Sequence, residues 1–154
     1  MKDLMKYAAS HTPPLHISAQ GVDVDVLGGS HRGSSHTLLD FRGPPRFDAI
    51  YAHVHLTCAE WLLVQEGQIE CTINGKISVL TAGDYIEVPP RVLHSWRNPT
   101  EHPFRVLIGF SDPDMDGYFF ELFDLLNDPN LWPTKDRAAI LDLNARYQTE
   151  VVAA

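Results

Sequence analysis

The sequence is poor in cysteine and in positive charge. Only two of its 154 residues are cysteines, Cys58 and Cys71, which is too few for the disulfide framework of a small secreted domain. Lys and Arg number 12 against 20 Asp and Glu, so the formal net charge is −8. Because binding to a phosphate backbone needs clustered Lys and Arg, this acidic balance predicts that the chain has no nucleic-acid partner.

Long apolar runs are missing as well. No stretch approaches the roughly 20 consecutive apolar residues that a transmembrane helix needs, and residues 1–7 lack the apolar core of a signal peptide. These absences predict no membrane partner and a cytoplasmic location. The sequence also shows no internal repeat and no second domain. With 44% hydrophobic and 21% charged residues, the composition is that of a globular domain, and we expect one domain over residues 1–154.

Two short motifs look functional but fail on closer reading. The glycines at residues 28–35 do not fit the dinucleotide-binding fingerprint, which needs a turn from a strand into a helix, so a hairpin loop is the better interpretation. Residues 112–117 resemble the start of an EF-hand loop, but its twelfth position would be Phe123, where calcium binding needs a bidentate Glu. We therefore interpret Asp116 as the cap of a helix.

Most of the chain is predicted to form short strands. Residues 22–27 alternate between apolar and polar, which is typical of a half-buried strand, and Asn74-Gly75 is a strong hairpin signal. Many short strands separated by turn residues indicate a sandwich or a barrel. After them, residues 118–126 and 134–147 have the pattern of two helices, the second with Ala138, Leu141 and Ala145 on one apolar stripe.

The most informative stretch runs from His53 to Asn98. Residues two apart in a strand project to the same face, so His53 and His55 point together, while Glu60 opens the next predicted strand and His94 begins a later one. Three imidazoles and a carboxylate on neighbouring strands suit a divalent transition metal such as Fe, Mn, Ni, Co, Cu or Zn. Histidines at alternate positions also occur in proteins without any metal.

This stretch resembles the two signature motifs of the cupin superfamily. Its first half reads H-x-H-x4-E-x6-G, ending at Gly67, and its second reads G-x5-P-x4-H-x3-N, beginning at Gly83. The sequence departs from the family pattern at two glycines that are not ligands, where it has Phe47 and Arg91. The resemblance implies that the metal ligands are His53, His55, Glu60 and His94.

The resemblance also implies the fold. We expect an all-β cupin double-stranded β-helix, a jelly-roll barrel, with a barrel core over residues 22–111. A C-terminal helical hairpin at about 116–147 would follow, as in many small bacterial cupins. Strand alternation would then place an apolar substrate pocket around the metal, lined by Tyr51, Leu62, Val64, Trp96, Val106 and Ile108. Those residues could equally do no more than fill the core.

Three functions remain open at this stage. The metal could activate dioxygen for a small hydroxylated aromatic or enolisable substrate, as in quercetinase-like dioxygenases, with Glu60 as ligand and catalytic base. It could instead act as a Lewis acid for a cyclisation or isomerisation. The third possibility is that the barrel binds a small ligand and catalyses no reaction. Four intact ligand positions favour an enzyme, and we predict a dioxygenase.

Two further expectations concern a thiol and assembly. Cys58 lies between two proposed ligands, but a free buried cysteine is more often an apolar filler, and we favour that interpretation.

Cupin barrels commonly pair through strands near the N-terminus, and an uncovered edge strand tends to be paired or covered. Leu15 and Ile17 make the N-terminal arm apolar enough to cross over, so we expect a homodimer.

Overall fold

The computed structural model describes residues 13–130 and 137–152, which form two antiparallel sheets and two helices. The strands are β1 (Leu15–Ala19), β2 (Val22–Gly28), β3 (Thr37–Gly43), β4 (Ile50–His55), β5 (Glu60–Glu66), β6 (Gln68–Ile73), β7 (Lys76–Thr81), β8 (Tyr85–Val88), β9 (His94–Arg97), β10 (Phe104–Phe110) and β11 (Thr149–Val151). The helices are α1 (Met115–Asn127) and α2 (Arg137–Arg146), and a 3-10 turn, η2, covers Ser30–Arg32.

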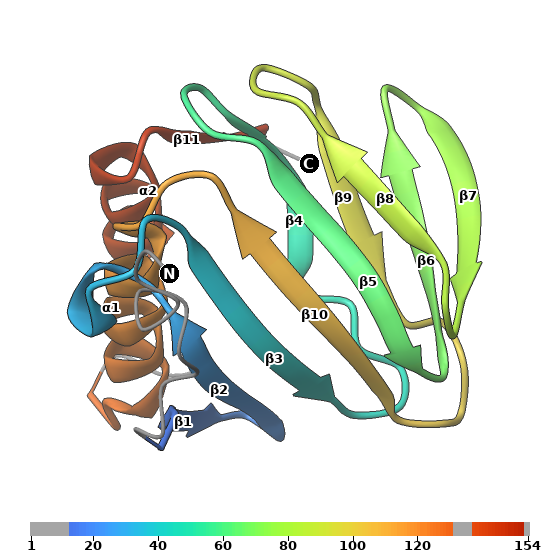
Figure 1. Ribbon diagram of the computed structural model, residues 1–154, viewed down its shortest axis with the longest axis horizontal. Coiled ribbons are helices and arrows are strands. Elements are labelled where there is room, and N and C mark those ends of the chain that lie inside the picture. Colours follow the sequence, from blue (N-terminus) through green and yellow to red (C-terminus); the bar gives the residue numbers. More distant parts are fainter. Residues whose placement is uncertain (1–12, 131–136, 153–154) are drawn as a thin grey trace, which may run out of the picture.

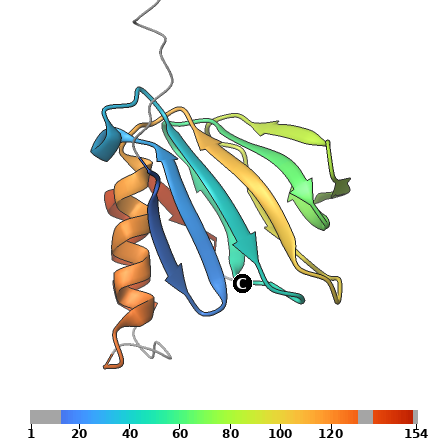
Figure 2. The ribbon, with the colours of Figure 1, turned by 60° about the horizontal axis from the view of Figure 1, so that its bottom comes forward.

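The two sheets face each other and enclose the core (Figures 1 and 2). The larger sheet has the strand order β1-β2-β3-β10-β5-β8, and the smaller one has the order β11-β4-β9-β6-β7. Strands that are far apart in the sequence, such as β3 and β10, therefore lie side by side. This two-sheet jelly roll confirms the predicted fold class. Helices α1 and α2 pack at the end of the sandwich where β1 and β11 form the sheet edges (Figure 1).

Alternation in the strands builds the core. In β2, Val24 and Val26 are fully buried while the intervening Asp25 faces outward. An aromatic cluster joins the two sheets: Phe41 of β3 contacts Trp96 of β9 edge-on at a centroid distance of 5.4 Å and stacks on Phe104 of β10 at 6.0 Å. Such offset and edge-to-face pairs add to the stabilisation that burial of the rings provides.

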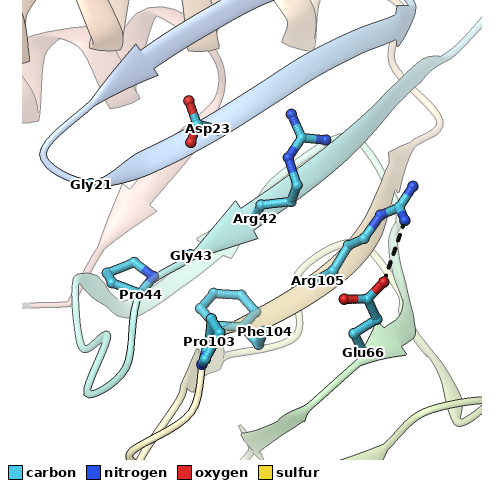
Figure 3. Close-up of a pocket in the computed structure, with 9 residues that line it drawn as sticks. All are labelled: Gly21, Asp23, Arg42, Gly43, Pro44, Glu66, Pro103, Phe104 and Arg105. Carbon is cyan, nitrogen blue, oxygen red and sulfur yellow. Dashed lines mark ion pairs between the residues drawn. The ribbon is translucent and has the colours of Figure 1, made fainter.

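The outer face of the larger sheet carries a group of charged side chains on β2, β3 and β10. Asp40, only 7% exposed, accepts two hydrogen bonds from Arg105 at 2.9 and 2.8 Å and pairs with Arg42 at 3.2 Å. A shallow hollow of about 320 Å³ lies on this face (Figure 3), lined by Gly21, Asp23, Arg42, Gly43, Pro44, Glu66, Pro103, Phe104 and Arg105. None of the proposed metal ligands lines it, and the charges of its two arginines are already balanced by neighbouring carboxylates.

One inward placement predicted for β4 is wrong. Tyr51 is 66% exposed and does not face the core. The pairing of β4 with β9 shifts register between Ile50 and His53, because Ile50 pairs with Trp96 and His53 with His94. This bulge inserts one extra residue, which reverses the alternation. Ile50 therefore packs against the core in the place predicted for Tyr51.

The C-terminal region also departs from the prediction. Asp116 lies inside α1 with no exposed surface, so it is not the residue preceding the helix. It accepts hydrogen bonds from the Ser30 hydroxyl at 3.0 Å and the His31 backbone N–H at 2.9 Å, which fasten the helix to η2. The predicted start of the second helix at residues 134–136 lies outside the described residues.

The buried face of α2 differs from the predicted stripe. Leu141 is 41% exposed, and Ala138 and Ala145 are exposed as well, whereas Leu143 and Asn144 are buried. The helix turns this second face inward because it packs against α1 and β11. Strand β11 had no counterpart in the prediction, since three residues are too few to show an alternation.

In the described part of the chain, no helix combines the length and apolarity needed to cross a membrane.

Gly67, the last residue of the first motif, has a backbone that excludes a side chain. Its φ is +75°, and an added Cβ would lie 2.6 Å from the carbonyl oxygen of Pro103. Gly75 has a similar φ of +80° with open space around it, so it offers a matched control. The left-handed conformation alone costs about 1–2 kcal/mol for a residue with a Cβ, and overpacking against fixed backbone adds roughly 1–3 kcal/mol.

We therefore predict that Gly67→Ala lowers the free energy of unfolding by about 2 kcal/mol more than Gly75→Ala does. Urea unfolding of the two variants and the parent, followed by circular dichroism, measures this difference. Equal losses in the two variants would show that the Pro103 carbonyl does not constrain Gly67.

Candidate metal centre

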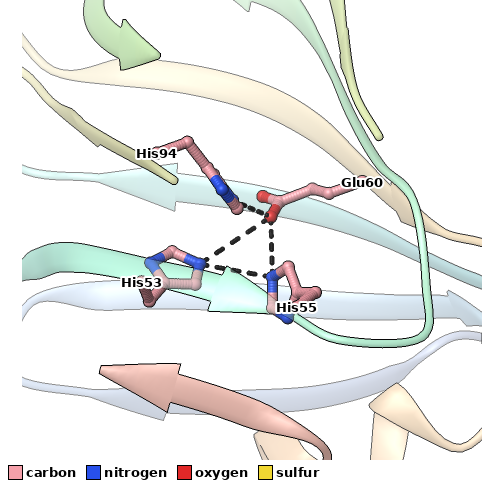
Figure 4. Close-up of side chains that lie close together, drawn as sticks. All are labelled: His53, His55, Glu60 and His94. Atoms are coloured by element: carbon pink, nitrogen blue, oxygen red, sulfur yellow. Dashed lines mark hydrogen bonds and ion pairs between the residues drawn. The ribbon is translucent and has the colours of Figure 1, made fainter. Parts of the chain in front are cut away.

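The four predicted ligands meet in space although they come from three strands. His53 and His55 lie on β4, while Glu60 and His94 are the first residues of β5 and β9. The antiparallel pairing of β4 with β9 sets His53 directly opposite His94. Figure 4 shows their side chains pointing toward one another, and one ligand atom from each lies within 4.8 Å of all the others. The tertiary structure thus assembles the group that the motif spacing predicted.

The distances between ligand atoms match those around a metal ion. Oε2 of Glu60 lies 2.9 Å from Nε2 of His55 and 2.8 Å from Nε2 of His94, and the Nε2 atoms of His53 and His55 are 3.2 Å apart. For metal–ligand bonds of about 2.1 Å, adjacent ligands at a right angle are separated by roughly 3 Å. The group therefore has the dimensions of a single-ion site.

The Nδ1 atoms fix which nitrogen of each ring faces the centre. Nδ1 of His53 lies 2.7 Å from the Tyr51 carbonyl oxygen, and Nδ1 of His94 lies 2.9 Å from that of Val92. A carbonyl oxygen only accepts hydrogen bonds, so both Nδ1 atoms carry a proton and donate it. In the neutral ring the inward Nε2 then presents a lone pair, which is the form that binds metals.

His55 is oriented in a different way. Its Nδ1 lies 2.9 Å from the hydroxyl oxygen of Thr149, and that hydroxyl donates its own proton to the Tyr147 carbonyl at 3.2 Å. The hydroxyl oxygen therefore accepts from Nδ1–H of His55. Thr149 belongs to β11 and is buried, yet no sequence motif indicated it, because it lies 94 positions away from His55.

Burial and charge shape the ionisation of the group. Burial is the largest influence on Glu60 and would raise its pKa, but its contacts with His55 and His94 prevail and hold that pKa well below the usual range. Burial lowers the pKa of His53 to about 4. Burial also opposes a charge on His94, but the adjacent Glu60 carboxylate raises its pKa. The centre thus combines an ionised carboxylate with a ring, His53, that stays neutral.

These donors fit a divalent transition metal. Two Nε2 lone pairs face each other across 3.2 Å at His53 and His55, an arrangement that repels unless a cation lies between them. A divalent ion satisfies the lone pairs and the buried carboxylate together, whereas a buried charge without such a partner is costly. Imidazole and carboxylate suit Fe, Mn, Ni, Co, Cu or Zn, so the donor set does not select one of these ions.

The remaining predicted residues have clear positions. Leu62, Val64, Val106, Ile108 and Trp96 are at most 3% exposed and belong to the core. Cys58 also lies in this core, and burial raises the pKa of its thiol to about 12. It is therefore held as the thiol, consistent with the filler role.

Asn98, the last motif residue, donates to the carbonyls of Pro44 and His102 at 3.1 and 2.7 Å and so fastens a loop.

We predict that His94→Ala removes most of the bound metal without unfolding the barrel, because it deletes one of four donors. The exposed His102 provides a matched control in His102→Ala. Metal content after purification without added metal measures the effect. A metal at 100 times its Kd should also stabilise the parent by about 2.7 kcal/mol, seen as a rise in Tm that His94→Ala lacks. Full occupancy in His94→Ala would refute the ligand assignment.

Comparison with curated proteins and family models points to one superfamily. The family model described as "Cupin domain" matches residues 41–110. The chain is 33% identical over 82 residues to quercetin 2,3-dioxygenase of Bacillus subtilis (strain 168), a match that covers 53% of this chain and 23% of that protein. The chain thus spans only about a quarter of the length of this curated relative.

Solved structures agree with this assignment. An RmlC-like cupin from Shewanella frigidimarina has a TM-score of 0.57 at 25% identity, over 71% of this chain and 96% of that one. Oxalate decarboxylase of Bacillus subtilis has a TM-score of 0.53 at 20% identity, over 66% of this chain and 28% of that one, a likeness of fold alone. Since the family match contains His53, His55, Glu60 and His94 and the strands that carry them, residues 41–110 form a domain of the cupin superfamily.

Proposed function

We propose that the protein is a metal-dependent enzyme, a dioxygenase-like oxidoreductase that acts on a small hydroxylated aromatic or enolisable substrate. The observation that carries this proposal is the group His53, His55, Glu60 and His94, whose donor atoms lie within 4.8 Å of one another. The match to a protein named quercetin 2,3-dioxygenase at 33% identity supports the redox reaction over other metal-assisted reactions.

A bound redox-active metal would supply the electron transfer that lets dioxygen react with an electron-rich organic substrate, so that both oxygen atoms enter the product. The residues of the chain that would hold the ion are His53, His55 and His94, as neutral imidazoles, and the carboxylate of Glu60. Four protein donors leave coordination positions open on a five- or six-coordinate ion, which distinguishes a catalytic site from a closed structural one.

The exposure of the ligands favours one side for substrate entry. The side chain of His53 is 13% exposed, whereas those of His55, Glu60 and His94 are 7%, 4% and 1% exposed. We propose that substrate approaches from the His53 side, past Val151, which pairs with His53 in the sheet. Leu62 follows Glu60 on the inward face of β5 and pairs with Ile108. These two side chains would form an apolar floor, and Val64, Val106 and Trp96 would support it from deeper in the core.

Glu60 has two proposed roles in this site. Its lowered pKa keeps it ionised, which favours its role as a ligand. As the catalytic base it would accept the hydroxyl proton of the substrate, provided that this hydroxyl comes within hydrogen-bond distance. Glu60→Gln separates the two roles, because the amide oxygen can still act as a donor to the metal while the amide cannot take up a proton.

We predict that the Fe-, Mn-, Co- or Ni-loaded protein consumes oxygen with at least one member of a panel of flavonols, catechols and β-diketones. Glu60→Gln should lower the rate by about 10²- to 10⁴-fold, the usual contribution of a general base, while part of the metal remains bound. The exposed Glu66 gives a control in Glu66→Gln. An oxygen electrode together with metal analysis makes the measurement.

The same experiment can contradict the proposal. Turnover at an equal rate under strict anaerobiosis, or with zinc as the only metal, would indicate a Lewis-acid cyclase or isomerase. A protein that takes up no metal and shows no turnover, yet binds a small ligand, would indicate a binding module. Either result would refute the oxidoreductase while leaving the cupin fold untouched.

We also propose that the protein is a homodimer. Strand β1 is the last strand of the larger sheet. Helix α1 packs beside it, and Asn127 donates to the Ser18 carbonyl at 2.9 Å, but Leu15 on this strand is 41% exposed. An uncovered edge strand tends to be paired or covered. The predicted crossover arm lies partly in residues 1–12, outside the described residues, while β1 pairs with β2 of its own chain.

Light scattering coupled to size exclusion is expected to give twice the chain mass of 17.3 kDa. Leu15→Lys should shift the protein toward the monomer, because it places a charge on the proposed interface. Leu141→Lys serves as a control, since Leu141 has the same exposure of 41% but lies on α2. A monomeric parent at working concentration would refute the proposal.

A further inference from the structure

The C-terminal strand reaches the metal centre through one side chain. Of the three imidazoles, His53 and His94 are oriented by carbonyl oxygens two residues before them on the same segment. His55 is the exception, because its Nδ1 partner is the hydroxyl of Thr149 on β11. Two ligands are therefore set by local backbone, and the third depends on a segment from the other end of the chain.

We infer that Thr149 is a positioning residue of the metal centre, and that β11 with α2 forms a C-terminal strap that sets the affinity of the site for metal. The inference rests on the metal centre proposed above and is independent of the reaction that the centre performs. Thr149 touches neither the metal position nor a substrate, and it acts only through His55.

The hydrogen bonds around Thr149 give it one defined role. Its hydroxyl has a single proton, which is donated to the Tyr147 carbonyl at 3.2 Å, so the oxygen is left as an acceptor for Nδ1–H of His55 at 2.9 Å. Thr149 is 4% exposed and His55 is 6% exposed, so water cannot easily replace the hydroxyl. Removing it would leave a buried imidazole N–H without a partner, which is costly.

The strap is itself held in place at several points. Strand β11 pairs with β4 in a register that sets Thr149 opposite His55, and backbone bonds join Leu56 to Gln148 at 2.8 Å and Val152 to Ala52 at 2.9 Å. At the end of α2, the Tyr147 hydroxyl donates to Glu121 of α1 at 2.7 Å, and Arg146 pairs with the same carboxylate at 2.7 Å. The position of the helical hairpin is thereby transmitted to one metal ligand.

The matched variants are Thr149→Val, which keeps the shape and removes the acceptor, and Thr149→Ser, which restores it. Outer hydrogen-bond partners of metal-binding histidines typically contribute 10- to 100-fold in affinity. We therefore expect Thr149→Val to raise the Kd for Co²⁺ or Zn²⁺ by at least about tenfold and to change the visible absorption spectrum of the Co²⁺ form. Thr149→Ser should return both to the values of the parent.

Thr37→Val is the control for general loss of stability. Thr37 is also buried, at 0% exposure, but its hydroxyl lies 2.8 and 3.0 Å from the carbonyls of Asp112 and Pro113, away from the histidines. This variant should lower Tm while leaving the Kd for metal unchanged. A parent-like Kd and Co²⁺ spectrum in Thr149→Val would overturn the inference, as would an equal loss of affinity in Thr37→Val.

A measurement on the unaltered protein keeps the inference testable should Thr149→Val not fold. In the metal-free parent at neutral pH, ¹⁵N NMR of the imidazoles should show His55 with a protonated Nδ1. A His55 protonated on Nε2 alone would overturn the inference. None of these readouts uses substrate or oxygen, so an absence of oxygen uptake would refute the proposed oxidoreductase and leave the role of Thr149 standing.

Discussion

The structure depends on a cluster of three imidazole nitrogens around one buried carboxylate. Glu60 is 3% exposed and His94 is 1% exposed, and placing such groups inside a core is costly unless each polar atom has a partner. On the outer side of each ring the Nδ1–H has an acceptor, and on the inner side a bound cation would be the partner of the Nε2 lone pairs. The Nε2 atoms converge on Glu60 or on each other, and the Nδ1 atoms donate to a carbonyl or a hydroxyl. Among the described residues, no buried side-chain polar atom lacks a hydrogen-bond partner.

The strand arrangement follows from the need to bring these groups together. His53 and His94 are 41 positions apart in the sequence and become opposite neighbours only because β4 and β9 are antiparallel. The backbone N–H of Arg91 donates to the carbonyl of His55 at 2.8 Å, so the turn that leads to His94 is fastened to the ligand strand. Arg91 has a φ of +67°, a left-handed conformation that favours glycine. This explains why the cupin motif has glycine where this chain has Arg91.

The helical end of the molecule is connected to the same cluster. Met115, Phe119 and Phe123 bury one face of α1 in the core, and Phe110 contacts both Phe119 and the ring of His55, at centroid distances of 5.9 and 5.4 Å. Helix α2 then directs the chain back so that β11 pairs with β4. The helices therefore lie behind the centre and reach it through Phe110 and β11, so their packing bears on the site as well as on the stability of the fold.

The sequence by itself determined the fold class and the four residues that meet at the candidate metal centre. Alternation of apolar residues is a local property, and it predicted the strand at residues 22–27, which the structure has as β2 (Val22–Gly28). The spacing of His53, His55, Glu60 and His94 is readable because each ligand lies in a motif with its own turn residues. The sequence also determined that Gly67 ends this motif, and the structure supplies the reason in its positive φ.

Only the tertiary structure decided the features that depend on contacts between distant segments. A one-residue bulge in β4 turned Tyr51 outward, and no local pattern marks a bulge, because it arises from the pairing with β9. The packing of α2 on α1 and β11 decided which face of this helix is buried. That face carries Leu143 and Asn144, and it is not the apolar stripe that the sequence predicted. Thr149 became a partner of His55 for the same reason. A hydroxyl near the end of the chain has no distinctive pattern, and it acquires a role only when β11 pairs with the ligand strand.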